Sequence, residues 1–299
     1  MTLLLGGGGQ LGRELRKIAP DDAAIEAPSS IELSVTDRSG LIRAAQSVNP
    51  MVVINAAAYT AVDDAESDRE AAFAVNAQGA RAVAEAARAV RARLIHVSTD
   101  FVFAGDQSLP YLPTDPTGPL GVYGESKLAG ERAVLETNPD HSLVVRTSWL
   151  YSAHRRNFVG TMLRLLAERS EIQVVVDQVG SPTWARSLAR AIWKWSALPA
   201  ASGLRHYSDA GVASWFDFAM AIREEGSNLG LLRGNISDTQ IRPIRTKDFP
   251  TPARRPALSV LDSFASWDEL GFTPLHWRDS LRLMLSEMAG SDRRRPADE

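Results

Sequence analysis

Short aliphatic runs alternate in the first half of the chain with longer segments in which apolar residues recur every three to four positions. The runs are typical of buried parallel strands, and the longer segments are typical of amphipathic helices. Strands are expected at 3–5, 24–27, 51–54, 94–97 and 143–145. Because strand and helix alternate at least five times, we predict an α/β fold, a Rossmann-type doubly wound parallel sheet with helices on both faces.

The helical segments between these strands have recognisable ends. Asp37 occupies the N-cap position of a pattern that runs to about residue 48, and a proline-rich loop precedes the pattern that begins at Tyr123. Trp193 and Trp195 are expected in the core. Further helices are expected at 68–91, 123–136, 157–168 and 277–288.

The chain divides at about residue 151. We assign residues 1–151 to a Rossmann domain, and its glycine-rich turn at 6–12 predicts that this domain is NAD(P)-binding. Residues 152–290 are expected to form a smaller, mainly substrate-binding C-terminal region, interleaved with the first, and the charged residues 291–299 are expected to form a disordered tail.

Composition narrows the class of protein. The 299 residues are 44% hydrophobic and 23% charged, with a formal net charge of -3, which gives no bias toward nucleic acid or an anionic membrane. The absence of cysteine excludes disulfides and thiolate chemistry. The N-terminus lacks the basic segment and apolar run of a signal peptide, and no apolar run is long enough to span a bilayer. We therefore expect a cytoplasmic protein with no nucleic-acid or membrane partner.

A glycine-rich turn follows the first strand. Gly6, Gly9 and Gly12 have the spacing G-x-x-G-x-x-G, and a helical pattern begins directly afterwards. This context suits a dinucleotide, whose pyrophosphate needs a tight turn, a close backbone and the N–H groups of a helix N-terminus. We therefore expect Gly6, Gly9, Gln10 and Leu11 to bind the cofactor. The alternative is a merely flexible turn.

Residues after the second strand are expected near the adenosine. Glu26 lies about 20 residues beyond the glycine turn, where an acid can bind the ribose and favour NADH. Ser34 and Val35 are expected to border the adenine. Since a glutamate on a half-exposed strand is equally well explained by solvation, both NADPH and NADH stay open as the cofactor.

Two later strands end in residues suited to a ligand site. Ala56, Ala57 and Ala58 follow the strand at 51–54, where small side chains leave space for a cofactor, although a tight packing turn explains them as well. Thr99 follows the strand at 94–97 and contributes a hydroxyl. Carboxyl ends of parallel strands meet at one edge, so Thr99 is expected on the same side as the glycine turn.

Tyr123 and Lys127 lie four residues apart and would share one face of a helix. A nearby ammonium favours phenolate, so we expect Lys127 to lower the pKa of Tyr123 and to make it a proton donor or acceptor near neutral pH. A Tyr and a Lys at this spacing also occur on ordinary solvated helix faces. The interpretation therefore depends on the other motifs.

Together these motifs resemble the extended short-chain dehydrogenase/reductases, and most closely the dTDP-4-dehydrorhamnose reductase subfamily. The similarity extends over nearly the whole chain. It rests on residues 9–12, 55–63, 97–103, 123–131, 146–149, 157–158, 177–183 and 254–256.

This resemblance implies reduction of a nucleotide-linked 4-keto-6-deoxyhexose by NADPH or NADH, with dTDP-L-rhamnose as the usual product. Lys127 would bind the nicotinamide ribose, Tyr123 would protonate the sugar C4 oxygen and Thr99 would hydrogen-bond that oxygen. These three are the expected catalytic residues, and Tyr123 and Lys127 also belong to the cofactor site. The residues expected to bind substrate are Thr60, Val62, Phe101, Trp149 and Arg255.

Trp149 and Arg255 also have support from the sequence itself. Trp149 follows a strand on the active edge and could stack on a sugar or base. Arg255, with Arg254, could hold a pyrophosphate through charge-assisted hydrogen bonds, although ordinary surface charge explains such a pair equally well.

The chain departs from the family pattern at several positions. Phe101 replaces a frequent tyrosine, and Leu258 replaces an asparagine. Some members bind Mg²⁺ at a dimer interface through glutamates, of which Glu14 matches one, whereas Arg186 takes the place of another. We therefore predict no metal site, and a homodimer stays open. The alternatives are a related reductase acting on another nucleotide-linked keto sugar, and a non-catalytic nucleotide-binding regulatory subunit.

Overall fold

A six-stranded parallel sheet forms the centre of the protein. A computed structural model describes residues 1–232 and 239–292. The strands follow the order β10-β5-β4-β3-β1-β2, and every neighbouring pair is parallel. The sheet confirms the predicted fold class. Its strands are β1 (Thr2–Leu5), β2 (Ile25–Glu26), β3 (Val52–Asn55), β4 (Arg93–Thr99), β5 (Ser142–Thr147) and β10 (Gly203–His206).

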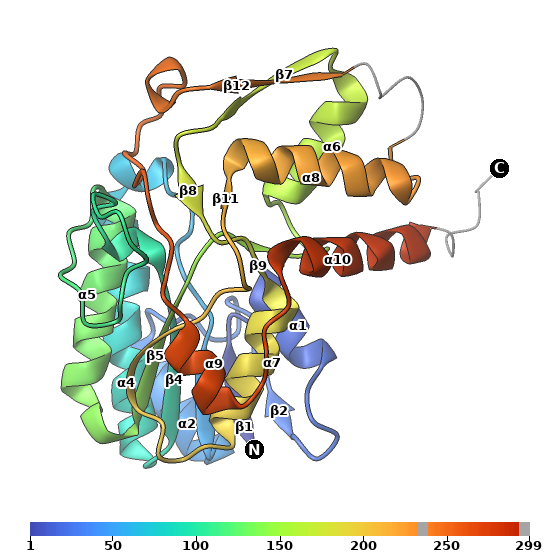
Figure 1. Ribbon diagram of the computed structural model, residues 1–299. Helices are drawn as coiled ribbons and strands as arrows, with labels where there is room; N and C mark the ends of the chain where they lie inside the picture. The colour runs from blue at the N-terminus through green and yellow to red at the C-terminus, as the bar shows by residue number, and fades with distance from the viewer. Residues whose placement is uncertain (233–238, 293–299) are drawn as a thin grey trace.

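Helices cover both faces of this sheet because successive strand residues point to opposite sides. Leu3 and Leu5 of β1 pack into the core beneath α2 (Arg38–Val48), α4 (Ala80–Ala89) and α5 (Val122–Thr137). Leu4 points the other way, into the core beneath α1 (Gln10–Lys17), α7 (Ala185–Ser196) and α9 (Phe264–Leu270). Figure 1 shows α4 and α5 to the left of the sheet and α1 and α7 to its right.

The helix predicted from 68 to 91 is interrupted. It begins at α3 (Arg69–Phe73), which Asp68 caps, and passes through a π-helical turn (Ala74–Gly79) before α4. The turn lies against α5 so closely that a Cβ at Gly130 would be 2.0 Å from the Asn76 carbonyl oxygen. The glycine therefore permits this close approach of the two helices.

A second layer of elements lies beyond the sheet, at the top of Figure 1. It has its own core, in which Met162, Phe218 and Leu281 are buried. Its helices are α6 (Phe158–Glu168), α8 (Trp215–Asn228) and α10 (Trp277–Asp292). Its paired strands are β6 (Leu150–Tyr151) with β9 (Thr183–Trp184), β7 (Glu171–Val175) with β12 (Gln240–Ile244), and β8 (Val179–Gly180) with β11 (Ala213–Ser214).

The two halves of the sequence are interwoven. β10 and α7 come from the second half yet join the sheet and core of the first, and Trp193 and Trp195 of α7 are buried there as predicted. α10 continues to Asp292, and the remainder of the expected tail, 293–299, lies outside the described residues.

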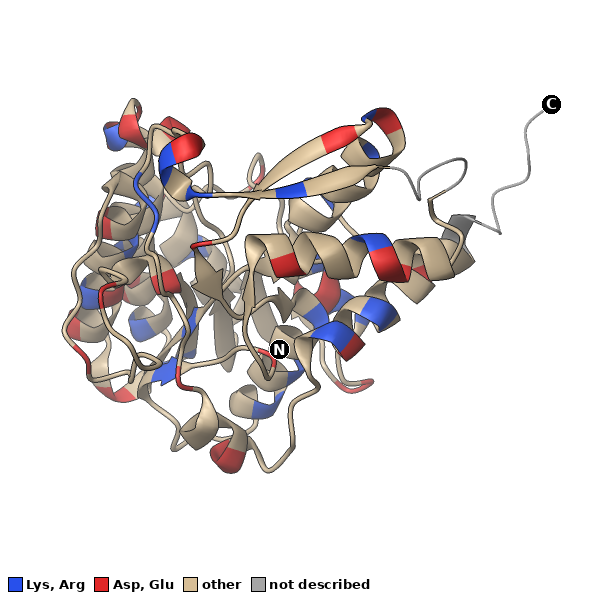
Figure 2. Ribbon diagram, turned by 45° about the horizontal axis from the view of Figure 1, so that its top comes forward, with Lys and Arg blue, Asp and Glu red and all other residues tan. Residues whose placement is uncertain are grey.

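Charge is spread over both layers. Figure 2 shows basic and acidic residues interspersed along the helices and loops. Within residues 1–232 and 239–292, no helix has the length and apolar character needed to cross a membrane.

Candidate active site

The glycine turn lies at the point where the sheet reverses its winding order. The chain leaves β1 toward β2 and leaves β3 in the opposite direction, toward β4, so the carboxyl ends of β1 and β3 flank a crevice. Gly6 has a φ of 82°, and a Cβ there would lie 2.6 Å from the Ala56 carbonyl carbon. A Cβ at Gly12 would lie 2.2 Å from the Gly6 oxygen. Both positions therefore require glycine.

The N-terminus of α1 opens onto this crevice. No side chain caps the helix at Gly9, so its first N–H groups remain donors for an anion. Two guanidinium groups flank the turn: Arg13 Nε and Arg155 Nε both donate to the Gly8 oxygen, at 3.2 Å and 3.0 Å. The tight glycine backbone, open helix end and nearby positive charge fit a dinucleotide pyrophosphate.

A cavity of about 840 Å³ begins at this turn and continues along the carboxyl edge of the sheet into the second layer. Of the predicted site residues, most line it: Gly9, Gln10, Leu11, Ala56, Ala58, Thr60, Val62, Thr99, Phe101, Tyr123, Lys127, Trp149 and Arg255. Gly6, Ser34, Val35 and Ala57 lie outside its wall. Val35 is instead buried in the core with Leu41 and Val83.

Three of these residues form one wall. Lys127 is 2% exposed, and its Nζ donates to the Val97 carbonyl oxygen at 2.7 Å. Tyr123 precedes it by one turn of α5, and Thr99 faces both from the end of β4. Thr99 Oγ1 donates to Asp100 Oδ1 at 3.0 Å. The wall thus combines a phenol, an ammonium and a hydroxyl.

Burial controls the ionisation of this wall. It raises the pKa of Tyr123 to about 12, opposed by the neighbouring Thr99 hydroxyl. The expectation that Lys127 lowers this pKa is therefore wrong for the structure, since desolvation outweighs any such attraction. Burial also lowers the pKa of Lys127 to about 8, against the attraction of Glu131. At neutral pH, Tyr123 holds its proton and can act as an acid.

The π-helical turn is hydrogen-bonded to the first turns of α5. Asn76 Oδ1 accepts from the Tyr59 N–H at 2.9 Å, and its Nδ2 donates to Ser126 Oγ at 3.0 Å. Ser126 Oγ in turn donates to the Tyr123 carbonyl oxygen at 2.8 Å. These bonds hold the first turn of α5, and with it Tyr123, against the loop after β3. π-Helical turns are frequent at functional sites.

An aromatic wall closes the far end of the cavity. Trp149, with a φ of 47°, stacks on Trp215 with ring centroids 3.5 Å apart and an interplanar angle of 4°. Phe158 packs at a tilt against Trp215. Gly180 leaves room for the indole, because a Cβ there would be 2.5 Å from Trp149. Sequence reasoning identified Trp149 but not Trp215, whose only local signal is the capping box that begins at Ser214.

Arg255 reaches the cavity already paired. Its Nη2 lies 2.7 Å from Asp63 Oδ2, and its Nη1 donates to Asp63 Oδ1 at 3.1 Å and to Thr251 Oγ1 at 2.6 Å. The hydrogen bonds from Arg255 also hold the pKa of Asp63 below its usual value. Any anion that Arg255 binds would therefore share the guanidinium with Asp63.

The two departures from the family pattern differ in position. Phe101 lies in the cavity wall and meets the Tyr123 ring edge to face, with centroids 5.6 Å apart. Leu258 lies outside the wall, where its N–H donates to the Gly105 oxygen at 3.3 Å. Only the change at Phe101 therefore alters a surface that a ligand in the cavity would touch.

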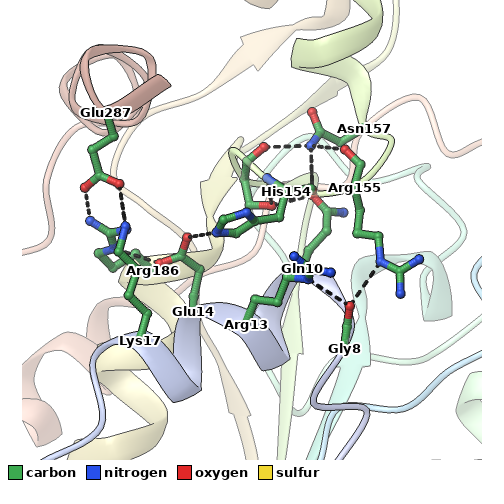
Figure 3. A network of polar contacts seen from close by, with 11 residues as sticks. Gly8, Gln10, Arg13, Glu14, Lys17, His154, Arg155, Asn157, Arg186 and Glu287 are labelled. Atoms are coloured by element: carbon green, nitrogen blue, oxygen red, sulfur yellow. Dashed lines mark hydrogen bonds and ion pairs between the residues drawn. The ribbon is translucent and has the colours of Figure 1, made fainter. Parts of the chain in front are cut away.

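A chain of charges occupies the place where the resemblance suggests Mg²⁺ (Figure 3). Glu14 is fully buried, and its Oε2 accepts from Arg186 Nε at 2.7 Å. Arg186 also pairs with Glu287, which receives a further hydrogen bond from Lys17 at 2.9 Å. Two carboxylates here face two fixed cations, so a divalent metal does not fit. The described part of the chain has no group of three potential metal ligands.

The loop at 152–157 connects this charge chain with the glycine turn. His154 Nε2 lies 3.5 Å from Glu14 Oε1. Ser152 Oγ and Asn157 Nδ2 each donate to Gln10 Oε1 at 3.0 Å. The loop also brings Arg155 and Arg156, which sequence reasoning did not identify, into the cavity wall. The loop at 152–157 thus contacts α1 at two positions, Gln10 and Glu14.

Comparison with known proteins agrees with this geometry. The family described as RmlD substrate binding domain matches residues 1–289. The dTDP-4-dehydrorhamnose reductases of Mycobacterium tuberculosis and Burkholderia thailandensis are 42% and 40% identical to the chain and cover 99% and 96% of it, over 96% and 98% of their own lengths.

Among solved structures, dTDP-4-dehydrorhamnose reductase from Bacillus anthracis in complex with NADP superposes with a TM-score of 0.88 at 36% identity, covering 96% of this chain and 98% of its own. The chain therefore belongs to the RmlD family, the dTDP-4-dehydrorhamnose reductases.

Proposed function

We propose that the protein reduces the C4 keto group of dTDP-4-dehydro-L-rhamnose, giving dTDP-L-rhamnose, with NADPH as the reductant. The observation that carries the proposal is the meeting of Thr99, Tyr123 and Lys127 at one wall of a cavity that begins at a dinucleotide-type turn. A regulatory subunit that only bound nucleotide would not require these three groups together. The relatives carry the same activity in their names, and one is a complex with NADP.

The proposed mechanism depends on the proton that Tyr123 can donate. The bound cofactor would supply hydride to the carbonyl carbon. Tyr123, which burial keeps protonated, would donate its proton to the C4 oxygen and be reprotonated from solvent. The buried ammonium of Lys127 would hold the nicotinamide ribose and favour the phenolate left behind, and the hydroxyl of Thr99 would donate to the same sugar oxygen. General-acid help of this kind is worth roughly 10²–10⁴-fold in rate.

We assign the two ends of the cavity to the two ligands. Gly9, Gln10 and Leu11 would hold the cofactor pyrophosphate, while Ala56 and Ala58 line its path along the sheet edge. The second layer, from about residue 152, would bind the nucleotide sugar. There Thr60, Val62, Phe101, Trp149 and Arg255 are the proposed substrate contacts, joined by Trp215.

The experiment is a cofactor oxidation assay. Purified protein is mixed with dTDP-4-dehydro-L-rhamnose and with NADPH or NADH in turn, and loss of reduced-cofactor absorbance is followed. We expect turnover with NADPH. The rate with NADH shows whether Glu26, exposed at the end of β2, permits NADH to replace NADPH. A matched reaction with a UDP-linked 4-keto sugar tests the choice of nucleotide.

The alternatives have distinct outcomes. Turnover only with another nucleotide-linked keto sugar would support the related reductase of the wider family. Tight NADPH binding without oxidation of any such sugar would favour the regulatory subunit. Sedimentation of the same preparation would test the homodimer, and fractionation of cells would test the cytoplasmic location, both of which stay predictions.

A further inference from the structure

A buried carboxyl that the proposed reaction does not use lies directly behind Thr99. Asp100 is 2% exposed and contributes to the cavity wall. Its Oδ1 accepts the Thr99 hydroxyl hydrogen at 3.0 Å, and its Oδ2 has no hydrogen-bond partner among the residues that the structure describes. The hydroxyl of Ser259 lies nearby and favours the ionised carboxyl, but no hydrogen bond of normal geometry reaches Oδ2.

The hydrogen of the Thr99 hydroxyl is held by Asp100 in this arrangement, and Tyr123 faces the same hydroxyl. A hydroxyl has one hydrogen and two lone pairs. The hydrogen goes to Asp100, and one lone pair accepts the Phe101 N–H at 3.3 Å. What remains is an acceptor, whereas stabilising a carbonyl oxygen as it gains negative charge requires a donor. Thr99 therefore cannot serve the proposed reduction until Asp100 releases its hydrogen.

We propose that Asp100 is a positioning residue for the proposed reduction, because its protonation state decides whether Thr99 points its hydrogen at Asp100 or into the cavity. The inference rests on the proposed function. An ionised carboxylate only accepts, so it holds the Thr99 hydrogen. A protonated carboxyl donates to Thr99 Oγ1, which then accepts from Asp100 and Phe101 and gives its own hydrogen to the sugar oxygen. Every donor and acceptor is then used.

The surroundings of Asp100 leave this exchange within an accessible pH range. Burial raises its pKa to about 6, against the hydrogen bonds of Ser259 and Thr99. From α5, Tyr123 is the titratable group that faces it, and Lys127 donates to the Val97 oxygen. The remaining cation of the wall near this end, Arg255, is paired with Asp63. Within the described part of the chain, no cation therefore pairs with this carboxyl and holds it in its ionised form.

The test is the pH dependence of kcat/KM, which reports ionisations of the free enzyme. For the wild type we expect kcat/KM to fall by at least about tenfold between about pH 5.5 and pH 8 as Asp100 ionises. Asp100→Asn supplies an amide donor at every pH, so this fall should disappear. In a Thr99→Val background, where no hydroxyl remains to be directed, Asp100→Asn should have no further effect on the profile.

Asp209 is the matched control. It is 1% exposed, burial raises its pKa to about 6 as well, and it lies outside the cavity wall. Asp209→Asn should therefore keep the wild-type fall of kcat/KM. NADPH affinity, measured by fluorescence titration, should be the same in wild type and Asp100→Asn, because Asp100 acts on the orientation of the Thr99 hydroxyl and has no assigned contact with the cofactor.

The outcomes separate this inference from the function on which it rests. If the wild type does not oxidise NADPH with any of the keto sugars, both the proposed function and the role of Asp100 are overturned. A wild type that turns over while Asp100→Asn keeps the same pH-dependent fall overturns the role of Asp100 alone. So does a fall that disappears equally in Asp209→Asn, or an effect of Asp100→Asn that persists in full without the Thr99 hydroxyl.

Discussion

The two polar clusters at the ends of α1 differ in the partners of their buried charged groups. In the cavity at its N-terminal end, an oxygen of Asp100 has no partner and the Lys127 ammonium makes one hydrogen bond although it has three N–H donors. In the cluster beside its second turn, Glu14, Arg186 and Glu287 are joined carboxylate to cation. Glu14, like Asp100, is buried and has one oxygen without a hydrogen-bond partner among the described residues, but its other oxygen is paired with the Arg186 cation. The two clusters therefore differ in charge pairing.

The comparison teaches which buried groups are available for chemistry. A charge that is already neutralised by a fixed partner can stabilise the fold but has little left to offer a substrate. A buried group with a free donor or acceptor costs free energy and is retained where a ligand completes it. The cavity wall is thus the reactive cluster, and the Arg186 cluster is a structural tie between α1, α7 and α10.

The largest expected effect comes from Tyr123→Phe, which removes the proton donor and nothing else. We expect kcat to fall at least about 10²-fold, within the 10²–10⁴ range of general-acid catalysis, while the melting temperature and NADPH affinity stay near those of the wild type. The assay is NADPH oxidation under saturating sugar. Full activity in this variant would remove Tyr123 from the mechanism.

Tyr111→Phe is the control for that variant. The Tyr111 hydroxyl is also buried but is satisfied by the backbone, accepting from Gly105 N–H at 2.8 Å and from Asp106 N–H at 3.1 Å. Its loss should lower stability, by about 1 kcal/mol per lost hydrogen bond, and leave kcat unchanged.

The second effect is on stability and concerns the paired cluster. Arg186→Met removes the shared cation and leaves the buried Glu14 carboxylate without it, which should destabilise the fold by about 3–5 kcal/mol. Glu287 is 35% exposed and keeps its ion pair with Lys17. Chemical denaturation measures the destabilisation. The exposed i,i+4 pair Arg164 and Glu168 is the comparison, since Arg164→Ala should cost only about 0.3–0.5 kcal/mol. Equal losses at the two sites would show that the buried cluster is not a structural tie.

A third prediction tests whether Arg186 takes the position of a metal. The wild-type melting temperature should be indifferent to Mg²⁺ and to chelator. Arg186→Glu instead places three carboxylates together and should gain stability from Mg²⁺, by about 2.7 kcal/mol at a hundred times the dissociation constant. If the wild type itself loses stability on chelation, the Arg186 guanidinium does not replace the metal, and a metal must bind in its presence.

A smaller effect is expected at the aromatic wall, through binding and not through the chemical step. Trp215→Ala removes the ring that stacks on Trp149, and such pairs are worth about 0.5–1.5 kcal/mol. KM for the nucleotide sugar should therefore rise by about two- to twelvefold with kcat nearly constant. Trp215→Phe should restore part of the loss. A fall in kcat alone would place Trp215 with the reactive wall.

The sequence predicted those features that depend on neighbours along the chain. The five expected strands correspond to β1 to β5, whereas β10 was not predicted. Asp37 caps a helix where the pattern placed it, and the glycine turn directly follows β1 as expected. These are local signals, because a cap or a turn involves only a few successive residues.

What the sequence did not predict depends on residues that are distant along the chain. Trp215 meets Trp149 only after β6 and α8 have packed together. The pKa of Tyr123 was predicted in the wrong direction because spacing gives the distance to Lys127 but not the extent of burial. The π-helical turn at 74–79 lies in close contact with α5, and hydrophobic periodicity does not detect that contact.

The smallest expected effect tests the rule itself, because Asp209 is buried with an unpartnered Oδ1 yet lies outside the cavity wall. Burial raises its pKa to about 6, so between about pH 4 and 6 the native chain holds a proton that the unfolded chain has lost. This residue therefore makes the free energy of unfolding fall as pH rises through that window. Asp209→Asn should remove that part of the slope without altering kcat. Asp63→Asn should remove a slope of the opposite sense at lower pH, because Arg255 lowers the Asp63 pKa and that stabilisation is lost on acidification below about pH 4. If Asp209→Asn instead abolishes turnover, an unpaired buried oxygen indicates function even outside the cavity. The contrast between the two clusters would then depend on pairing alone, and the position of a group in the cavity wall would not matter.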